Sequence, residues 1–155
     1  MDRQTLIEKL NESFTGEGLA VGDTPDMASL TVECEQLVDI CKKLRHDAPF
    51  HFDYLMSVTA VDRPEDNIFE LVYHLYAMGH RCAVCVKTTV GRDNPIVPSV
   101  SEIWPAADGH EREPYALLGV LFAGHKDLRR ILLPDEWEGF PLRKDYQDDF
   151  MLVKD

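Results

Sequence analysis

The chain has 155 residues, 45% of them hydrophobic and 28% charged, which fits one ordinary globular domain. Its net charge of −12 opposes nonspecific binding to nucleic acid or to an anionic membrane surface, because both carry charge of the same sign. No apolar run approaches the ~18 residues of a spanning helix, and the N-terminus lacks a signal-peptide core. We therefore expect a cytoplasmic chain without direct membrane insertion.

The first half of the chain predicts alternating helices and strands. Residues 2–14 carry apolar side chains at helical spacing, with Asp2 available as the N-cap. Two short strands, near 19–22 and 29–32, flank a turn at 23–26. Residues 35–49 return to helical spacing, with basic residues near the C-terminal end, and Pro49 closes the helix.

Three longer strands follow at 50–61, 67–78 and 80–90, joined by short turns, and they predict an antiparallel meander. The order α-β-β-α-β-β-β predicts a two-layer α+β fold. Both helices should cover one face of a mixed, mostly antiparallel sheet, followed by short helices and an extended C-terminal tail.

The four cysteines are expected to be reduced, structural thiols. Cys82 and Cys85 form a C-x-x-C pattern, but their odd spacing within a strand points the two thiols to opposite faces. They therefore cannot share a metal ion. Cys34 and Cys41, seven residues apart, are expected on one helical face as small core residues.

After the meander, residues 91–99 predict a loop. Ser99 with Glu102, and then Asp108 with Glu111, match the capping-box pattern for two short helices. Pro114 lies too deep in the second segment for a regular helix, so we expect that helix to be kinked or delayed, with Gly119 as its stop. Trp104 should be buried against the sheet.

The C-terminal tail mixes charged and large apolar residues between prolines. Pro134, Gly139 and Pro141 prevent one helix or strand from running through it. Such a segment cannot build its own core and leaves backbone groups unpaired, so it favours a partner surface. We predict an α+β domain over residues 1–133 and a partner-binding tail over 134–155.

Two motifs resemble a known family. "EREPYALLGVLFAGHKDLRRIL" followed by "WEGFPLRKDY" resembles the 30-kDa subunit family of respiratory complex I, which carries the letter C in the bacterial NADH-quinone oxidoreductases. The chain departs from the family pattern at Ala116, where the family has an acid, at Leu118, where an aromatic is common, and at Phe140, where a histidine is usual. The order and length of the remaining elements are similar, so the resemblance covers nearly the whole chain.

The resemblance implies a non-catalytic subunit in the peripheral arm of a proton-translocating NADH-quinone oxidoreductase, with NADH dehydrogenase (quinone) activity only in the complex. It implies no cofactor in this chain, with flavin, iron-sulfur clusters and quinone in partner subunits. The implied partners are the large (49-kDa-type) catalytic subunit and the small iron-sulfur subunit, on the cytoplasmic side of the cell membrane.

Candidate residues for the partner interface lie in the signature and the tail. Arg and Trp anchor interfaces most often, which favours Arg129, Arg130, Trp137 and Arg143. An alternative is that the acids of the signature pair internally with Arg129 or Arg130. The full candidate set is Glu111, Arg112, Glu113, His125, Asp127, Arg129, Arg130, Trp137, Glu138, Phe140, Leu142, Arg143, Lys144, Asp145 and Tyr146.

Other functions remain open. The departures from the family pattern allow the equivalent subunit of an energy-converting nickel-iron hydrogenase or formate hydrogenlyase complex, in which a nickel-iron site would lie in a partner. A free-standing adaptor would fit the tail but leave the signature unexplained. A stand-alone enzyme is disfavoured, because no G-x-S-x-G or H-E-x-x-H motif is present.

Overall fold

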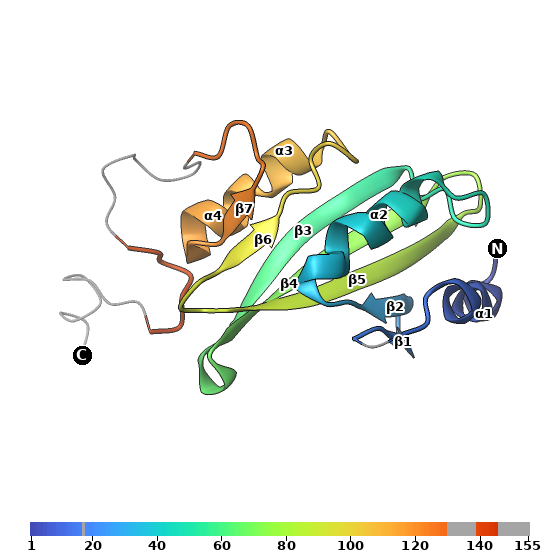
Figure 1. The fold of residues 1–155 in the computed structure, drawn as a ribbon, viewed down its shortest axis with the longest axis horizontal. Coiled ribbons are helices and arrows are strands. Elements are labelled where there is room, and N and C mark those ends of the chain that lie inside the picture. Colours follow the sequence, from blue (N-terminus) through green and yellow to red (C-terminus); the bar gives the residue numbers. More distant parts are fainter. Residues whose placement is uncertain (17, 130–138, 146–155) are drawn as a thin grey trace.

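The computed structural model describes residues 1–16, 18–129 and 139–145 (Figure 1). The predicted order of helices and strands in the first half is confirmed. These elements are α1 (Arg3–Ser13), β1 (Ala20–Asp23), β2 (Ala28–Thr31), the 3-10 turn η1 (Cys34–Gln36), α2 (Leu37–His46), β3 (Tyr54–Arg63), the 3-10 turn η2 (Pro64–Asp66), β4 (Ile68–Ala77) and β5 (Cys82–Gly91).

Five strands form the main sheet in the order β1-β2-β5-β4-β3. Strands β3, β4 and β5 form the predicted antiparallel meander, and β1 pairs antiparallel with β2. The pairing of β2 with β5 is parallel, so the sheet is mixed. The predicted mixed, mostly antiparallel α+β fold is therefore confirmed.

Both helices pack on the same face of this sheet. Asp2 caps α1 as predicted, with its Oδ1 accepting from the backbone N–H of Thr5 at 2.7 Å. Alternate residues of β4 are buried beneath the helices. The resulting single core contains Leu6 and Leu10 of α1, Leu37, Ile40, Cys41 and Leu44 of α2, and Phe69, Leu71, Tyr73 and Leu75 of β4.

The cysteines are all free thiols. Cys82 belongs to the core, whereas Cys85 lies on the other face, opposite His74 of β4 and Ser29 of β2. The prediction that the two thiols point apart is thus confirmed. The expectation for Cys34 was wrong: it lies in η1, before α2 begins, and its Sγ is 3.8 Å from the carbonyl oxygen of Ile96.

The second half contains a small sheet that the sequence did not predict. Strands β6 (Ile96–Pro98) and β7 (Leu121–Ala123) pair in parallel, so part of the expected loop at 91–99 is a strand. Between them lie the short helices α3 (Ala107–His110) and α4 (Arg112–Leu118), beside the edge strand β3 (Figure 1).

The two helices are separated at Glu111. Pro114 has no backbone N–H, so it cannot donate to the carbonyl of His110, and the helix restarts one residue later. The predicted delayed helix is therefore confirmed, as is its stop at Gly119, which has a left-handed backbone with φ 83°. Trp104 is buried as expected, and its Nε1 donates to the carbonyl of Phe52 at 2.8 Å.

Both predicted capping boxes were wrong. Residues around Ser99 form a turn instead of a capped helix, and neither α3 nor α4 has a side-chain cap. The side chain of Ser99 donates to Glu111, 12 residues along the chain, and Asp108 pairs with Arg112. These polar side chains therefore bind other side chains instead of the backbone N–H groups of a first helical turn.

Candidate partner-binding surface

The first acid of the signature segment, Glu111, is completely buried. Its Oε1 accepts from the Ser99 hydroxyl at 2.6 Å, and its Oε2 accepts from the backbone N–H of Val100 at 3.1 Å. Burial raises the pKa of this carboxyl, although both hydrogen bonds oppose the shift. Glu111 therefore fixes the loop before α3 to the break between α3 and α4.

The next residue, Arg112, is the centre of an ion-pair network. Its Nη2 lies 2.9 Å from Asp108 of α3 and 2.9 Å from Asp127, which follows β7. Its Nε donates to the carbonyl of Asp127 at 2.9 Å. The ring of His125 is enclosed beside it, with Nε2 2.8 Å from the carbonyl of Asp108. This network fixes the start of the tail to the helices.

The signature acids do not make the internal pairs with Arg129 that the sequence allowed. Glu111 binds Ser99 and Val100, while Arg129 approaches Asp127 at 3.5 Å and remains largely exposed. Arg130 lies outside the described residues. The tail's start is thus attached through Asp127 to Arg112.

Residues 139–145, which we name the strap, lie against the domain. Arg143 is the main attachment: its Nε donates to the carbonyl of Leu118 at 2.7 Å, and its guanidinium lies 5.2 Å from the Phe69 ring centroid and 4.8 Å from that of Phe140. The backbone N–H of Leu142 donates to the carbonyl of Leu117 at 3.0 Å. The strap therefore satisfies carbonyls at the C-terminal end of α4.

The strap also ends on a buried ion pair. Asp62 of β3 lies 2.8 Å from Arg92, and their side chains are only 2% and 13% exposed. Asp62 accepts from the backbone N–H of Lys144 at 2.8 Å, and Arg92 reaches Asp145 at 2.8 Å. The hydrogen bond to Arg92 lowers the pKa of Asp145. Two strap residues thus bind a charge pair of the main sheet.

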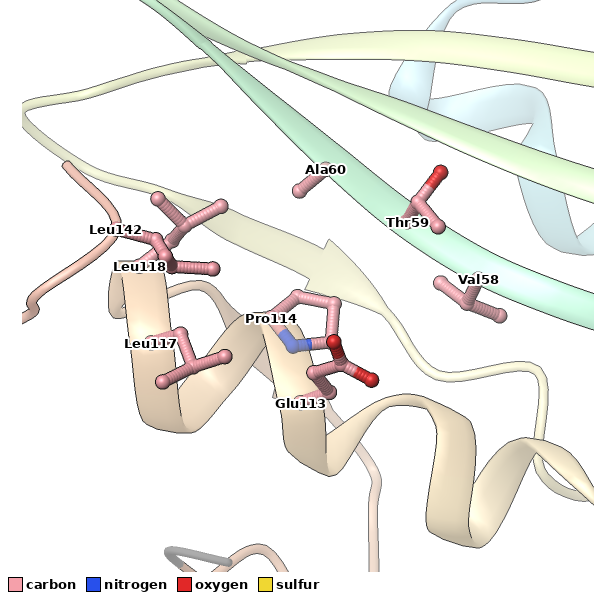
Figure 2. A pocket seen from close by; sticks show the side chains of 8 residues that line it. All are labelled: Val58, Thr59, Ala60, Glu113, Pro114, Leu117, Leu118 and Leu142. Atoms are coloured by element: carbon pink, nitrogen blue, oxygen red, sulfur yellow. The ribbon is translucent and has the colours of Figure 1, made fainter. Parts of the chain in front are cut away.

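A cavity of about 160 Å³ opens between β3 and α4. Figure 2 shows side chains of both elements facing this space, with Leu118 and Leu142 at one end and Glu113 near Pro114. Leu142 is 57% exposed, so the apolar surface continues outward from the cavity. The lining residues are Val58, Thr59, Ala60, Glu113, Pro114, Leu117, Leu118 and Leu142.

The structure brings most of the predicted interface residues to one end of the domain. The signature residues gather around α3 and α4, and the described tail residues form the strap beside them. Whether they contact a partner stays a prediction. Arg130, Trp137, Glu138 and Tyr146 lie outside the described residues.

Sequence reasoning missed Ser99, Asp62 and Arg92. Ser99 and Arg92 carry no distinctive local signal. Asp62 did: it is an acid at an inward position of a strand, paired with the core residue Phe69. A buried carboxylate in such a place calls for a cationic partner. Distant partners of this kind are set by tertiary packing.

Neither a metal site nor a spanning helix is found in the described ranges. No group of three or more His, Cys, Asp or Glu side chains there could hold a metal ion. In the same residues, every helix is too short or too polar to cross a membrane.

Comparisons with known proteins place this arrangement in a wider group. Residues 30–149, from β2 into the tail, match the model of the family described as respiratory-chain NADH dehydrogenase, 30 Kd subunit. An NADH-quinone oxidoreductase subunit of Roseiflexus sp., designated by the letter C, is 38% identical over 94% of this chain and 84% of its own length. The subunit of the same name from Moorella thermoacetica is 43% identical, covering 92% of this chain and 93% of its own length.

Solved structures share the fold. A chain of the membrane-bound sulfane sulfur reductase, an archaeal respiratory membrane complex, superposes with a TM-score of 0.80 at 24% identity, covering 97% of this chain and 88% of that one. The trypsin-resistant fragment of Nqo5 gives 0.64, also at 24% identity, covering 81% and 98%. From the extent of the family match and the identity to these relatives, the chain belongs to the family of the 30-kDa subunit of respiratory-chain NADH dehydrogenase.

Proposed function

We propose that this chain is a peripheral-arm subunit of a proton-translocating NADH-quinone oxidoreductase, with a structural and assembly role beside the large catalytic subunit. The observation that carries the proposal is the near full-length similarity to proteins named as NADH-quinone oxidoreductase subunits. The signature segment supports it physically, because its charged residues build a fixed surface next to the tail.

The signature acids do not resemble a catalytic pair. The carboxylate of Glu111 is enclosed and engaged by Ser99 and Val100, whereas Glu113 is exposed and lines the cavity at β3. An acid and a base must converge on one substrate atom to act together. The proposed role of both residues is therefore structural or in partner recognition, with flavin, iron-sulfur clusters and quinone bound by other subunits.

The proposed partners are the large (49-kDa-type) catalytic subunit and the small iron-sulfur subunit, at the cytoplasmic side of the membrane. We assign docking to the tail, residues 134–155, together with the adjoining signature surface. The exposed apolar side chain of Leu142 supports this assignment, since such surface is often covered in a complex.

A second candidate is the equivalent subunit of an energy-converting hydrogenase or formate hydrogenlyase complex. It is favoured by Phe140, which stands where the complex I pattern usually has histidine and packs against Arg143. The two candidates differ in the metal and flavin content of the captured partners and not in the role of this chain.

Affinity capture of the tagged chain from gently solubilised membranes tests the proposal. Capture of iron-sulfur and flavin-containing subunits, with NADH-quinone activity in the eluate, is expected. A nickel-iron partner would select the second candidate, and capture of no redox protein would favour the free-standing adaptor. A chain ending at Leu133 is the matched control, and it should capture much less.

A further inference from the structure

The cavity between β3 and α4 has one charged lining residue in an otherwise mostly apolar wall. Val58, Ala60, Pro114, Leu117, Leu118 and Leu142 form that wall, and Glu113 supplies the only ionisable side chain among the lining residues. Figure 2 shows the Glu113 carboxylate on the α4 side of the same space that the β3 side chains face. The cavity is open to solvent, because Glu113 and Leu142 are both exposed.

Glu113 differs from the charged residues around it. Arg112 and Asp108 are held in ion pairs, and Glu111 is held by two hydrogen bonds. Among the residues that the structure describes, no cation lies within ion-pair distance of Glu113 and no hydrogen bond restrains its carboxylate. The carboxylate is therefore available to a cation from outside the described part of the chain.

We propose that this cavity receives a basic side chain, lysine or arginine, of the large catalytic subunit, whose charged group pairs with Glu113. Lysine and arginine bury an aliphatic stem against apolar surface while the charged end reaches a polar group. The cavity offers that combination, with leucine and proline side chains beside a single carboxylate.

The charge of the chain supports this occupant over an acidic or purely apolar one. The net charge of −12 attracts cationic partner surfaces and repels acidic ones. A purely apolar side chain would fill the space but would bury the Glu113 carboxylate without a counterion, which is unfavourable. A basic side chain avoids that cost and adds a charge-assisted hydrogen bond.

The site also adjoins the strap. Leu142 lines the cavity, and its backbone N–H is bonded to the carbonyl of Leu117, another lining residue. The tail thus forms part of the cavity wall, which links the inferred contact to the proposed docking role of the tail. The inference rests on the proposed function, because it takes a subunit of the oxidoreductase as the partner.

Three variants of the full chain test it. Glu113→Lys reverses the charge at the cavity, Glu113→Gln removes it, and Thr59→Trp fills the space without changing charge. Glu65→Lys is the matched control, because it makes the same charge change at an exposed position in η2, away from the lining residues. Each variant is used in affinity capture from native membranes, with far-UV circular dichroism and thermal melting as folding controls.

We expect Glu113→Lys and Thr59→Trp to weaken capture of the large subunit by ~10-fold, and Glu113→Gln to weaken it less and to reduce its salt sensitivity. Glu65→Lys should capture normally. If folded Glu113→Lys and Thr59→Trp chains capture as well as the unmodified chain, the inference is wrong while the proposed function stands. If the unmodified chain captures no redox subunit, the proposed function itself fails.

Discussion

The guanidinium of Arg143 donates a 2.7 Å hydrogen bond to the carbonyl oxygen of Leu118, 25 residues earlier in the chain. Leu118 is the last residue of α4, so this carbonyl lacks a partner within the helix. The same guanidinium lies over the rings of Phe69 and Phe140, which join the sheet to the strap. One side chain therefore connects the sheet, α4 and the tail.

Replacing Arg143 by alanine should destabilise the isolated chain by about 1–3 kcal/mol, since a charge-assisted hydrogen bond and two cation–π contacts are lost. Urea unfolding followed by circular dichroism measures the change. Lys144→Ala is the control, because Lys144 contacts Asp62 only through its backbone N–H. Equal midpoints for the Arg143→Ala and unmodified chains would show that the strap adds nothing to the domain's stability.

Gly119 should not tolerate a side chain. A Cβ there would lie 2.8 Å from the Phe140 ring and 2.9 Å from the Arg143 guanidinium, and the residue has φ +83°. Gly119→Ala should therefore cost ~1–2 kcal/mol in backbone strain alone and also displace the strap. Gly109→Ala, at a helical position with open space, should be neutral or stabilising. Thermal melting of both variants gives the comparison.

The Asp62–Arg92 pair predicts a large effect of a distant mutation. Arg92→Ala leaves the nearly buried Asp62 carboxylate without its cation, so we expect a loss of about 3 kcal/mol in the free energy of unfolding. Arg129→Ala, which removes an exposed cation, should cost less than about 0.5 kcal/mol. Chemical denaturation of the isolated chains distinguishes the two, and similar costs would contradict the burial argument.

Glu111 should make stability depend on pH. Its pKa is raised in the folded chain, so the folded chain binds the proton more tightly than the unfolded chain. This contribution is fully present below the ordinary glutamate pKa of about 4.3 and is lost as pH rises through the raised pKa. The unmodified chain should therefore lose stability relative to Glu111→Gln between acidic and neutral pH.

Two variants separate the charge of Glu111 from its hydrogen bonds. Glutamine can accept from Val100 and donate to Ser99, so Glu111→Gln should fold normally. Glu111→Ala leaves the Val100 N–H unpaired in a buried place and should cost about 1–3 kcal/mol at any pH. Denaturation midpoints at acidic and neutral pH measure both effects. A pH-independent difference between the unmodified chain and Glu111→Gln would refute the burial argument.

Trp104 should report a dry environment. The chain has two tryptophans, so Trp137→Phe leaves Trp104 as the sole fluorophore. Because Trp104 is 2% exposed, its emission should be blue-shifted in the native chain and move to longer wavelength in urea. A native spectrum matching that of free tryptophan would contradict its placement.

The local elements could be predicted because their signals lie within a few residues. Asp2 caps α1 because its carboxylate needs only the N–H of Thr5. Alternation along β4 sends Phe69, Leu71 and Tyr73 to one face through the pleat of the strand alone. Likewise, the odd spacing of Cys82 and Cys85 sufficed to separate their thiols.

Tertiary structure decided where the polar groups found partners. The spacing of Ser99, Glu102, Asp108 and Glu111 fits two helix caps, yet Ser99 and Glu111 bind each other and Asp108 binds Arg112. The parallel pairing of β6 with β7 likewise joins segments more than 20 residues apart. Local pattern cannot rank such alternatives, because a buried carboxylate is stabilised by whichever donor the completed fold brings to it, at any distance along the chain.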